Sequence, residues 1–99
     1  MTSDRVTFSP EALAALEELT AYIAERNPDA AEQVRAAVLA AAERLALPAP
    51  RLDGPAAVLR NGVTCRRWFV HPVTLYYRRA PDMLEVVRVH HHAREPIAR

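Results

Sequence analysis

The sequence contains no lysine, so its thirteen permanently charged basic residues are all arginines. Its single cysteine, Cys65, excludes an internal disulfide and is compatible with a cytoplasmic protein. No apolar run is long enough to span a bilayer. Asp4 and Arg5 interrupt the N-terminus before any apolar stretch, so no signal peptide is predicted. These absences predict a cytoplasmic protein without a disulfide framework or a membrane segment.

The length of the chain predicts one small domain over residues 1–99. Hydrophobic residues make up 51% of the sequence, but nineteen of them are alanines. Alanine favours helices and adds little buried area. The core is therefore expected to depend on a few large side chains.

The charges are unevenly distributed along the chain. Residues 1–50 carry four arginines and eight acidic residues, a net charge of −4, whereas residues 51–99 carry nine arginines and four acidic residues, a net charge of +5. The small total charge therefore hides an acidic half and a basic half. A surface rich in guanidinium groups suits an anionic partner.

A short strand and two helices are predicted in the first half. Residues 6–8 are β-prone and are followed by Ser9-Pro10-Glu11, a strong helix start. Apolar residues then recur at three- and four-residue steps, and this helix should end near Arg26. Asn27-Pro28-Asp29 repeats the start signal and predicts a second helix over about residues 29–47. The short connection predicts an antiparallel helical hairpin.

Three strands are predicted in the second half. Prolines and glycines make residues 48–62 a long surface loop, in which Val58-Leu59-Arg60 could form a short piece of structure. Residues 63–70, 73–79 and 83–91 are rich in β-branched and aromatic residues and are separated by turn signals. Their short connections predict an antiparallel meander.

These elements predict an α+β fold of order β-α-α-β-β-β, with the helical hairpin on one face of a small antiparallel sheet. The other face should be partly exposed and carry arginines. Alternation places Arg66 and Trp68 on one side of their strand and Arg67 and Phe69 on the other, but does not identify the sides. In the last strand, alternation places one set of residues on one side and a second set on the other. The first set is Leu84, Val86, Arg88 and His90, and the second is Val87, Val89 and His91.

Five segments together resemble the ParE/RelE superfamily of bacterial toxins, and the ParE branch most closely. They are Val6–Ala12, Leu16–Arg26, Pro50–Leu52, Tyr76–Arg78 and Val86–His91, joined by an alanine-rich second helix. The resemblance covers nearly the full length. The order of the segments is more specific for the fold than for the activity.

The resemblance implies the toxin of a type II toxin–antitoxin pair, with a role in plasmid stabilisation and a hetero-oligomer with a ParD-like antitoxin. ParE-like members are associated with inhibition of DNA gyrase, whereas RelE-like members cleave mRNA on the ribosome. The two branches share one architecture. We predict a ParE-like toxin that binds gyrase, needs no cofactor and catalyses no reaction. The alternatives are a RelE-like ribonuclease and a non-toxic binding module of the same fold.

Residues of the predicted strands and the C-terminal segment are the candidates for target binding. They are Arg66, Arg67, Trp68, Arg78, Arg88, His91 and Arg94. Clustered arginines favour a binding face, although scattered surface arginines also keep small proteins soluble. Trp68 is interpreted as a residue of the core or its edge, and an aromatic anchor among arginines is the other interpretation.

A ribonuclease of the RelE type would need groups that activate a hydroxyl and stabilise the charge on the phosphate. The candidates for these roles are Arg66, Arg78, Arg88 and His91. The absence of lysine, and of a tyrosine after His91, departs from the RelE pattern. The departures favour the gyrase hypothesis.

Three apolar residues lie off the main helical stripes: Leu19, Tyr22 and Leu39. If they face solvent, they form part of a groove for the antitoxin. The alternative is that the buried stripe of each helix is wide.

The run His90-His91-His92 raises the question of a metal site. Successive residues of a regular strand point to opposite faces, so three neighbours cannot bind one ion. We therefore predict no metal site, and interpret the run as an exposed strand end.

Overall fold

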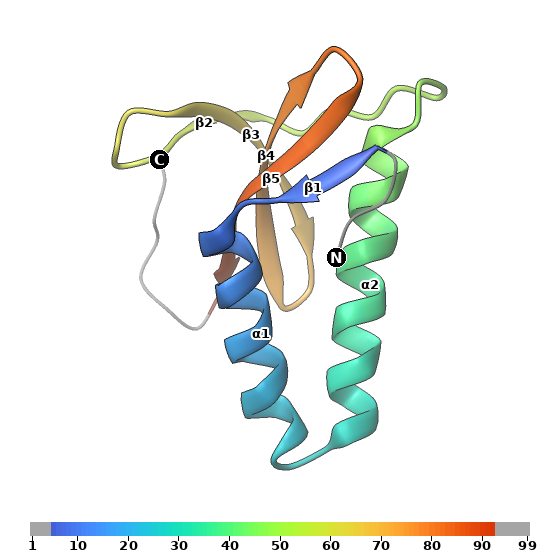
Figure 1. Ribbon diagram of the computed structural model, residues 1–99, viewed down its shortest axis with the longest axis vertical. Helices are drawn as coiled ribbons and strands as arrows, with labels where there is room; N and C mark the ends of the chain where they lie inside the picture. Colours follow the sequence, from blue (N-terminus) through green and yellow to red (C-terminus); the bar gives the residue numbers. More distant parts are fainter. Residues whose placement is uncertain (1–4, 93–99) are drawn as a thin grey trace.

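Two antiparallel helices cover one side of a five-stranded sheet (Figure 1). The structure is a computed structural model that describes residues 5–92. The helices are α1 (Pro10–Ala24) and α2 (Pro28–Ala46). The strands are β1 (Val6–Phe8), β2 (Ala56–Val58), β3 (Thr64–Val70), β4 (Val73–Ala80) and β5 (Met83–His91).

Both helices begin at the predicted caps. The hydroxyl of Ser9 accepts a hydrogen bond from the backbone N–H of Ala12 at 3.0 Å. The same hydroxyl donates to the carbonyl oxygen of Val87 at 2.8 Å, which ties the start of α1 to the last strand. The side chain of Asn27 accepts from the N–H of Ala30 at 3.1 Å and starts α2. Each cap satisfies a backbone donor that a helix start leaves unpaired.

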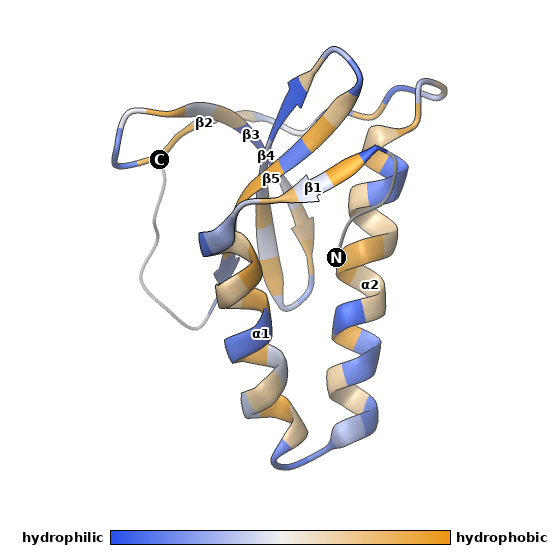
Figure 2. Ribbon diagram, viewed as in Figure 1, coloured by the Kyte–Doolittle hydropathy of each residue, from blue (hydrophilic) through white to orange (hydrophobic). Residues whose placement is uncertain are grey.

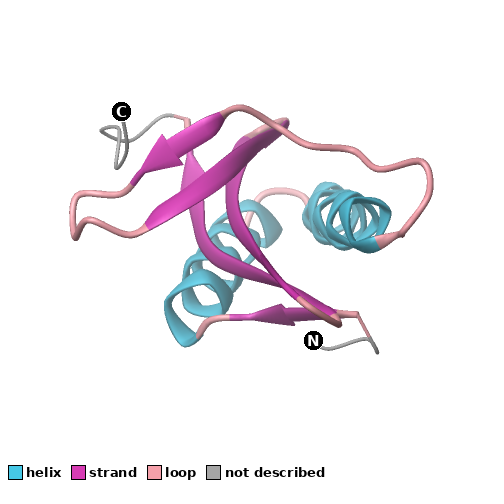
Figure 3. Ribbon diagram, turned by 90° about the horizontal axis from the view of Figure 1, so that it is seen from above, coloured by secondary structure: helices cyan, strands magenta, loops and turns pink. Residues whose placement is uncertain are grey.

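The sheet has the strand order β1-β5-β4-β3-β2, with β1 and β2 at its two edges (Figure 3). Strand β1 pairs with β5 in parallel, and every other pair is antiparallel. The predicted order of elements is confirmed, but the sheet is mixed rather than antiparallel. It also gains β2 within the segment predicted as a loop, because residues 56–58 pair with the outer edge of β3.

The main core lies between the helices and the sheet. The largest side chains in it with less than 2% exposure are Leu16, Val38, Leu45, Val73, Leu75, Tyr77, Leu84 and Val86. Hydrophobic and hydrophilic bands alternate along both helices, as expected for helices with one buried side (Figure 2). Burying each such aliphatic side chain contributes about 1.5–3 kcal/mol.

A second apolar cluster lies on the opposite face of the sheet, which we call the open face. It consists of Ala57, Leu59, Cys65, Tyr76 and Val87, all at most 8% exposed. Burial raises the pKa of the Cys65 thiol, and the nearby charge of Arg78 partly opposes this effect. The open face is therefore not a bare arginine surface, because its centre is apolar and buried.

A β-bulge changes the predicted alternation in β5. Tyr77 pairs with Val86, whereas its neighbour Tyr76 pairs with Arg88. Val87, which lies between these two partners, is therefore an extra residue in β5. Strict alternation would place Val89 opposite Val86, yet both belong to the main core. The prediction for the second half of this strand was wrong because a bulge inserts one residue and shifts the side-chain phase.

Candidate functional site

The adjacent arginines of β3 lie on different faces of the sheet. Trp68 packs against the main core, so Arg66, two residues earlier, also lies on the helix side. Its guanidinium group donates to the carbonyl oxygen of Gly54 at 2.8 Å. Arg67 lies on the open face opposite Tyr76 of β4. The residues predicted to bind a target therefore do not share one surface.

Two further candidate arginines form ion pairs. Arg78 on the open face lies 2.8 Å from Glu85 of β5. Arg88 lies 3.7 Å from Glu11 in the first turn of α1. Both pairs are partly exposed, and exposed pairs contribute only about 0–1 kcal/mol. Replacing either acidic partner by an acidic group of another molecule would therefore cost little free energy.

Arg67 is exposed on the open face, in β3. Within residues 5–92 its guanidinium group has neither a hydrogen-bond partner nor an ion-pair partner. Its charge acts on the neighbouring Tyr76, whose pKa is raised by burial and partly lowered again by this charge. The guanidinium group is thus available to a partner from outside the chain.

An aromatic cluster lies at the end of the sheet where β3 turns into β4. Phe69 is 65% exposed, and its ring stacks on His92 with centroids 4.8 Å apart. His71 meets the edge of the same phenylalanine at 6.5 Å. A ring nitrogen of His92 lies 2.7 Å from the hydroxyl of Thr74. Burial lowers the pKa of His92, and the charges of His71 and His91 lower it further.

The consecutive histidines are divided between two pairing positions as predicted for a strand, but the expectation of an exposed strand end is wrong for His90, which is buried. His91 pairs with Val73, a residue of the main core, whereas His90 pairs with Thr74. Among residues 5–92 no group of three or more histidine, cysteine or acidic side chains is placed to hold a metal ion.

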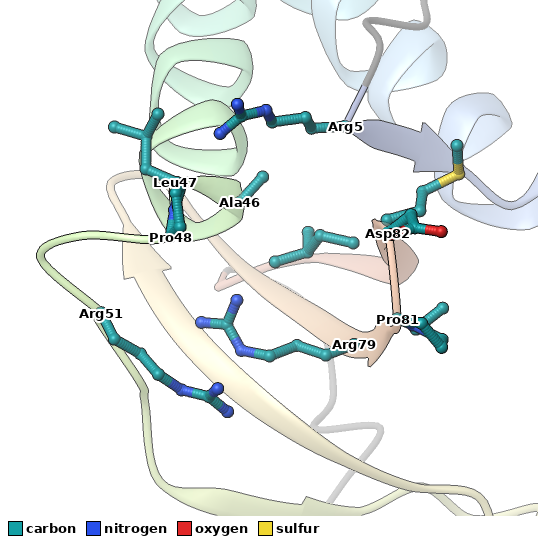
Figure 4. A pocket seen from close by; sticks show the side chains of 11 residues that line it. Arg5, Ala46, Leu47, Pro48, Arg51, Arg79, Pro81 and Asp82 are labelled. Atoms are coloured by element: carbon teal, nitrogen blue, oxygen red, sulfur yellow. The ribbon is translucent and has the colours of Figure 1, made fainter.

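A cavity of about 620 Å³ lies where α2 ends (Figure 4). Three arginines line it: Arg5 before β1, Arg51 in the loop after α2, and Arg79 near the end of β4. The rest of the lining is apolar, except for Asp82 in the turn between β4 and β5. The cavity thus brings together arginines from three separate parts of the chain.

Arg79 is fixed by the end of α2 and by the loop that follows this helix. It donates to the carbonyl oxygens of Leu45 at 2.6 Å and Leu52 at 2.5 Å, and to the carboxylate of Asp53 at 3.0 Å. Arg51 binds the same carboxylate at 2.9 Å. The hydrogen bond from Arg51 lowers the pKa of Asp53, burial opposes it, and the hydrogen bond from Arg79 lowers it further.

The sequence analysis did not single out the three arginines of this cavity. One signal was present: Arg79 lies in phase with Leu75 and Tyr77, both buried in the main core. An arginine in phase with core residues must find partners at the edge of the core. Arg5 and Arg51 carried no comparable signal, because they lie outside regular elements.

A family model described as "ParE toxin of type II toxin-antitoxin system, parDE" matches residues 6–96. The chain belongs to this family. Among solved structures, "Chromosomal ParDE TA system from P. aeruginosa" contains a similar chain at 13% identity and a TM-score of 0.68. The alignment covers 88% of this chain and 94% of that one, which shows that the two share a fold. A search of curated proteins found no match.

Membership of the ParE family makes the chain the toxin of a toxin–antitoxin pair and implies an antitoxin as its partner. Within residues 5–92 neither helix has the length and hydropathy needed to cross a membrane.

The four residues considered for RelE-like cleavage do not meet in this ParE family member. Arg66 is level with Tyr77 of β4, whereas His91 is level with Val73. Four residues along a strand correspond to about 13 Å. Arg78 lies on the other face and is paired with an acidic residue. Arg66, Arg78 and His91 therefore do not lie within hydrogen-bond distance of one another.

The three residues considered for antitoxin binding differ in exposure. Leu19 is 8% exposed and belongs to the main core, because the buried stripe of α1 is wide enough to include it. The expectation of an exposed groove residue is therefore wrong for Leu19. Tyr22 is 55% exposed and lies under the guanidinium group of Arg26, 5.7 Å from its ring centroid. Leu39 is half-buried, and Arg94 of the target-binding set lies outside the described residues.

Proposed function

We propose that this ParE family member acts in the cytoplasm by binding and inhibiting DNA gyrase, without catalysing a reaction. The match to the ParE family model over residues 6–96 carries the proposal, because ParE-like toxins are associated with gyrase inhibition. The separation of Arg66 from His91 supports a non-catalytic mode of action.

The open face is the proposed contact surface for gyrase. Arg67 and Arg78 extend from adjacent strands of this face, and Phe69 is exposed on the same side of β3 as Arg67. Arginines beside an exposed aromatic ring are a composition enriched at the centres of protein interfaces. An acidic surface on the target would complement them.

Induction of the chain alone in a bacterial host tests the proposal. We expect arrested growth with filaments and a DNA-damage response, and the purified chain should inhibit supercoiling by purified gyrase. Rapid loss of translation with cleaved mRNA would instead indicate a nuclease. Normal growth, with no effect on gyrase, would indicate a non-toxic binding module.

The Arg67→Ala variant tests the contact surface. We expect about tenfold weaker inhibition of supercoiling, because an interface arginine often contributes more than about 1 kcal/mol. Stability should change little, since the guanidinium group has no partner within residues 5–92. Arg44→Ala, an exposed position in the last turn of α2, is the matched control. Equal inhibition by both variants would contradict the assignment of the open face.

We also propose that a ParD-like antitoxin covers the exposed side of α1 and α2, including Tyr22. Tyr22→Ala should weaken binding of the antitoxin encoded beside the gene by about tenfold or more, because buried tyrosines are common hot spots. Isothermal titration calorimetry of the antitoxin into the parent chain and into Tyr22→Ala measures the two affinities. The melting temperature should remain close to that of the parent chain, since this ring is 55% exposed.

Leu19→Ala separates binding from stability on the same helix. Its side chain is 8% exposed, so truncation should lower the free energy of unfolding by about 2–5 kcal/mol. If Tyr22→Ala destabilises the chain as much as Leu19→Ala does, the tyrosine belongs to the fold rather than to the interface.

A further inference from the structure

We propose that the outer edge of β2 binds an extended segment of a partner protein that carries an acidic residue, and that this segment adds a further strand to the sheet. Strand β2 forms one edge of the sheet and contains neither a charged residue nor a proline, which natural proteins often place on an edge to prevent pairing. In Figure 1 this strand lies at the left of the sheet, whereas α2 lies at the right. The edge is separate from the open face and from the exposed side of the helices, and it therefore adds a third recognition site.

The backbone of β2 offers hydrogen-bonding groups at two positions. Pro55 and Leu59, which flank this strand, are bonded to β3 and to the residue before β3, at 3.0 and 2.9 Å. Such bonds recur at every second residue of an antiparallel pair, so Ala57 also faces β3, whereas Ala56 and Val58 face outward. Within residues 5–92 no strand lies beyond them. An extended segment running antiparallel to β2 would bond to both N–H groups and both carbonyl oxygens.

The open-face side of β2 favours an apolar residue in the partner. Ala57 and Leu59 belong to the second apolar cluster, which therefore reaches the outermost strand. Residues directly opposite each other on paired strands carry their side chains on the same face. The partner residue level with Ala57 would thus lie at the rim of this cluster, where an apolar side chain would bury further apolar area.

The helix side of β2 favours an acidic residue. Arg66 is level with Ala56, whose side chain is only a methyl group. Its guanidinium group donates to the carbonyl oxygen of Gly54 at 2.8 Å, which holds it on the β2 side of β3 and leaves further N–H donors. A partner residue level with Ala56 would lie two strand spacings from Arg66, about 10 Å between Cα atoms. The side chains of an arginine and a glutamate together span that distance.

The edge therefore specifies an order of residues in the partner. Val58 is 48% exposed on the helix side, so an apolar residue level with it would cover it. Read in the antiparallel direction, the segment is apolar, apolar, acidic, level with Val58, Ala57 and Ala56. A second copy of β2 does not fit this order, because antiparallel pairing would place Val58 of the other copy level with Ala56 and bring no carboxylate to Arg66. The charge thus favours an acidic partner over self-association.

Addition of a peptide to the full-length chain labelled with nitrogen-15 tests the edge. The probe is acetyl-Thr-Val-Val-Glu-Thr-amide, and the same peptide with glutamine is its uncharged control. We expect saturable shifts of the amide signals of Ala56 and Val58, and slower hydrogen exchange at both, because these N–H groups would donate to the peptide. The amide of Ala57, which faces β3, should change little. The glutamine peptide should bind about fivefold more weakly.

Two N-methylated peptides test whether the probe binds as a strand. Methylation of the first valine, level with Val58, removes an N–H that faces β2 and should weaken binding at least about tenfold. Methylation of the second valine removes an N–H that faces away from β2 and should change the affinity by no more than about twofold. Both peptides carry the same added methyl group, so their comparison isolates the hydrogen bond.

Variants of the chain identify the groups involved. Val58→Pro removes an outward N–H and should weaken the probe at least about tenfold, while the bonds to β3 remain, because edge strands tolerate proline. The melting temperature shows whether the fold is intact, and Ala56→Pro provides the same test if Val58→Pro does not fold. Arg66→Gln should bind the glutamate and glutamine peptides equally. Arg44→Ala on α2 should keep the preference of the parent chain.

Equal affinities of the two methylated peptides would overturn the proposal, as would equal affinities of the glutamate and glutamine peptides for the parent chain. If protection of the Ala56 and Val58 amides rises with protein concentration in the absence of peptide, the edge belongs to a second copy and the proposal is also overturned. The readout is binding to the isolated chain, so its failure would leave the gyrase and antitoxin proposals intact. Failure of gyrase inhibition would equally leave the edge site intact.

Discussion

Replacement of Gly54 by alanine is expected to lower the free energy of unfolding by about 4 kcal/mol or more, a large part of the stability of a small domain. An added Cβ would lie 1.7 Å from the carbonyl oxygen of Arg67, which is backbone and cannot rotate away. The local backbone is also fixed, because the N–H of Arg67 donates to Pro55 at 3.0 Å. The N–H of Gly54 itself donates to the hydroxyl of Tyr77 at 2.8 Å. Relief of the clash would break both bonds.

Gly62→Ala is the matched control for this experiment. A Cβ added at Gly62 would meet no heavy atom within 4 Å, so the φ of +88° at this residue is the source of the expected cost. A left-handed backbone costs a non-glycine residue about 1–2 kcal/mol. Denaturant unfolding of both variants gives the comparison. If Gly54→Ala is as stable as Gly62→Ala, the segment before β2 does not lie against β3 as the structure shows.

Arg79→Ala is also expected to have a large effect, a loss of about 3 kcal/mol of stability. The side chain is 22% exposed and donates to Leu45, Leu52 and Asp53. Its removal leaves two carbonyl oxygens at the edge of the core without their donor, and unsatisfied buried groups each cost about 1–3 kcal/mol. The variant also detaches the end of α2 from the loop that follows it.

Arg78→Ala is the control, because it removes the same group from the adjacent position of β4. Its ion pair with Glu85 is exposed, so the variant should lose no more than about 1 kcal/mol. Arg79→Lys should recover only part of the loss, because an ammonium group cannot bridge three acceptors with the planar geometry of a guanidinium group. Equal unfolding midpoints for Arg78→Ala and Arg79→Ala would refute the bridging role.

The elements predicted most accurately from the sequence are those set by local chemistry. Ser9 and Asn27 start their helices because a side-chain oxygen satisfies a nearby backbone N–H, and this depends on only a few residues. The three strands of the second half were placed to within a residue at each end, since turn signals separate them. The resemblance to the ParE family, which the family model confirms, was recognised from the order of these elements.

Features that depend on distant partners could not be predicted in this way. Strand β2 forms because β3 offers an edge, and its own three residues carry little strand signal. The extra residue at Val87 arises from the register between two strands, which alternation within one strand does not contain. The same limit applies to the arginines: Arg66 and Arg67 were both identified, but the packing of Trp68 decides which face each occupies.

The position of β5 has a consequence for how the protein is made. This strand lies between β1 and β4 and contacts both helices, yet it is the last regular element of the described chain to leave the ribosome. Until then the apolar sides of α1 and α2 have no complete sheet to cover them, and β1 has no neighbour to pair with. Folding therefore has to wait until β5 has left the ribosome, because the closing contacts join β5 to β1 and to the helices near the start of the described residues. A prematurely terminated product lacking β5 would lack the strand that joins β1 to β4, and so would be unable to complete the sheet of the toxin.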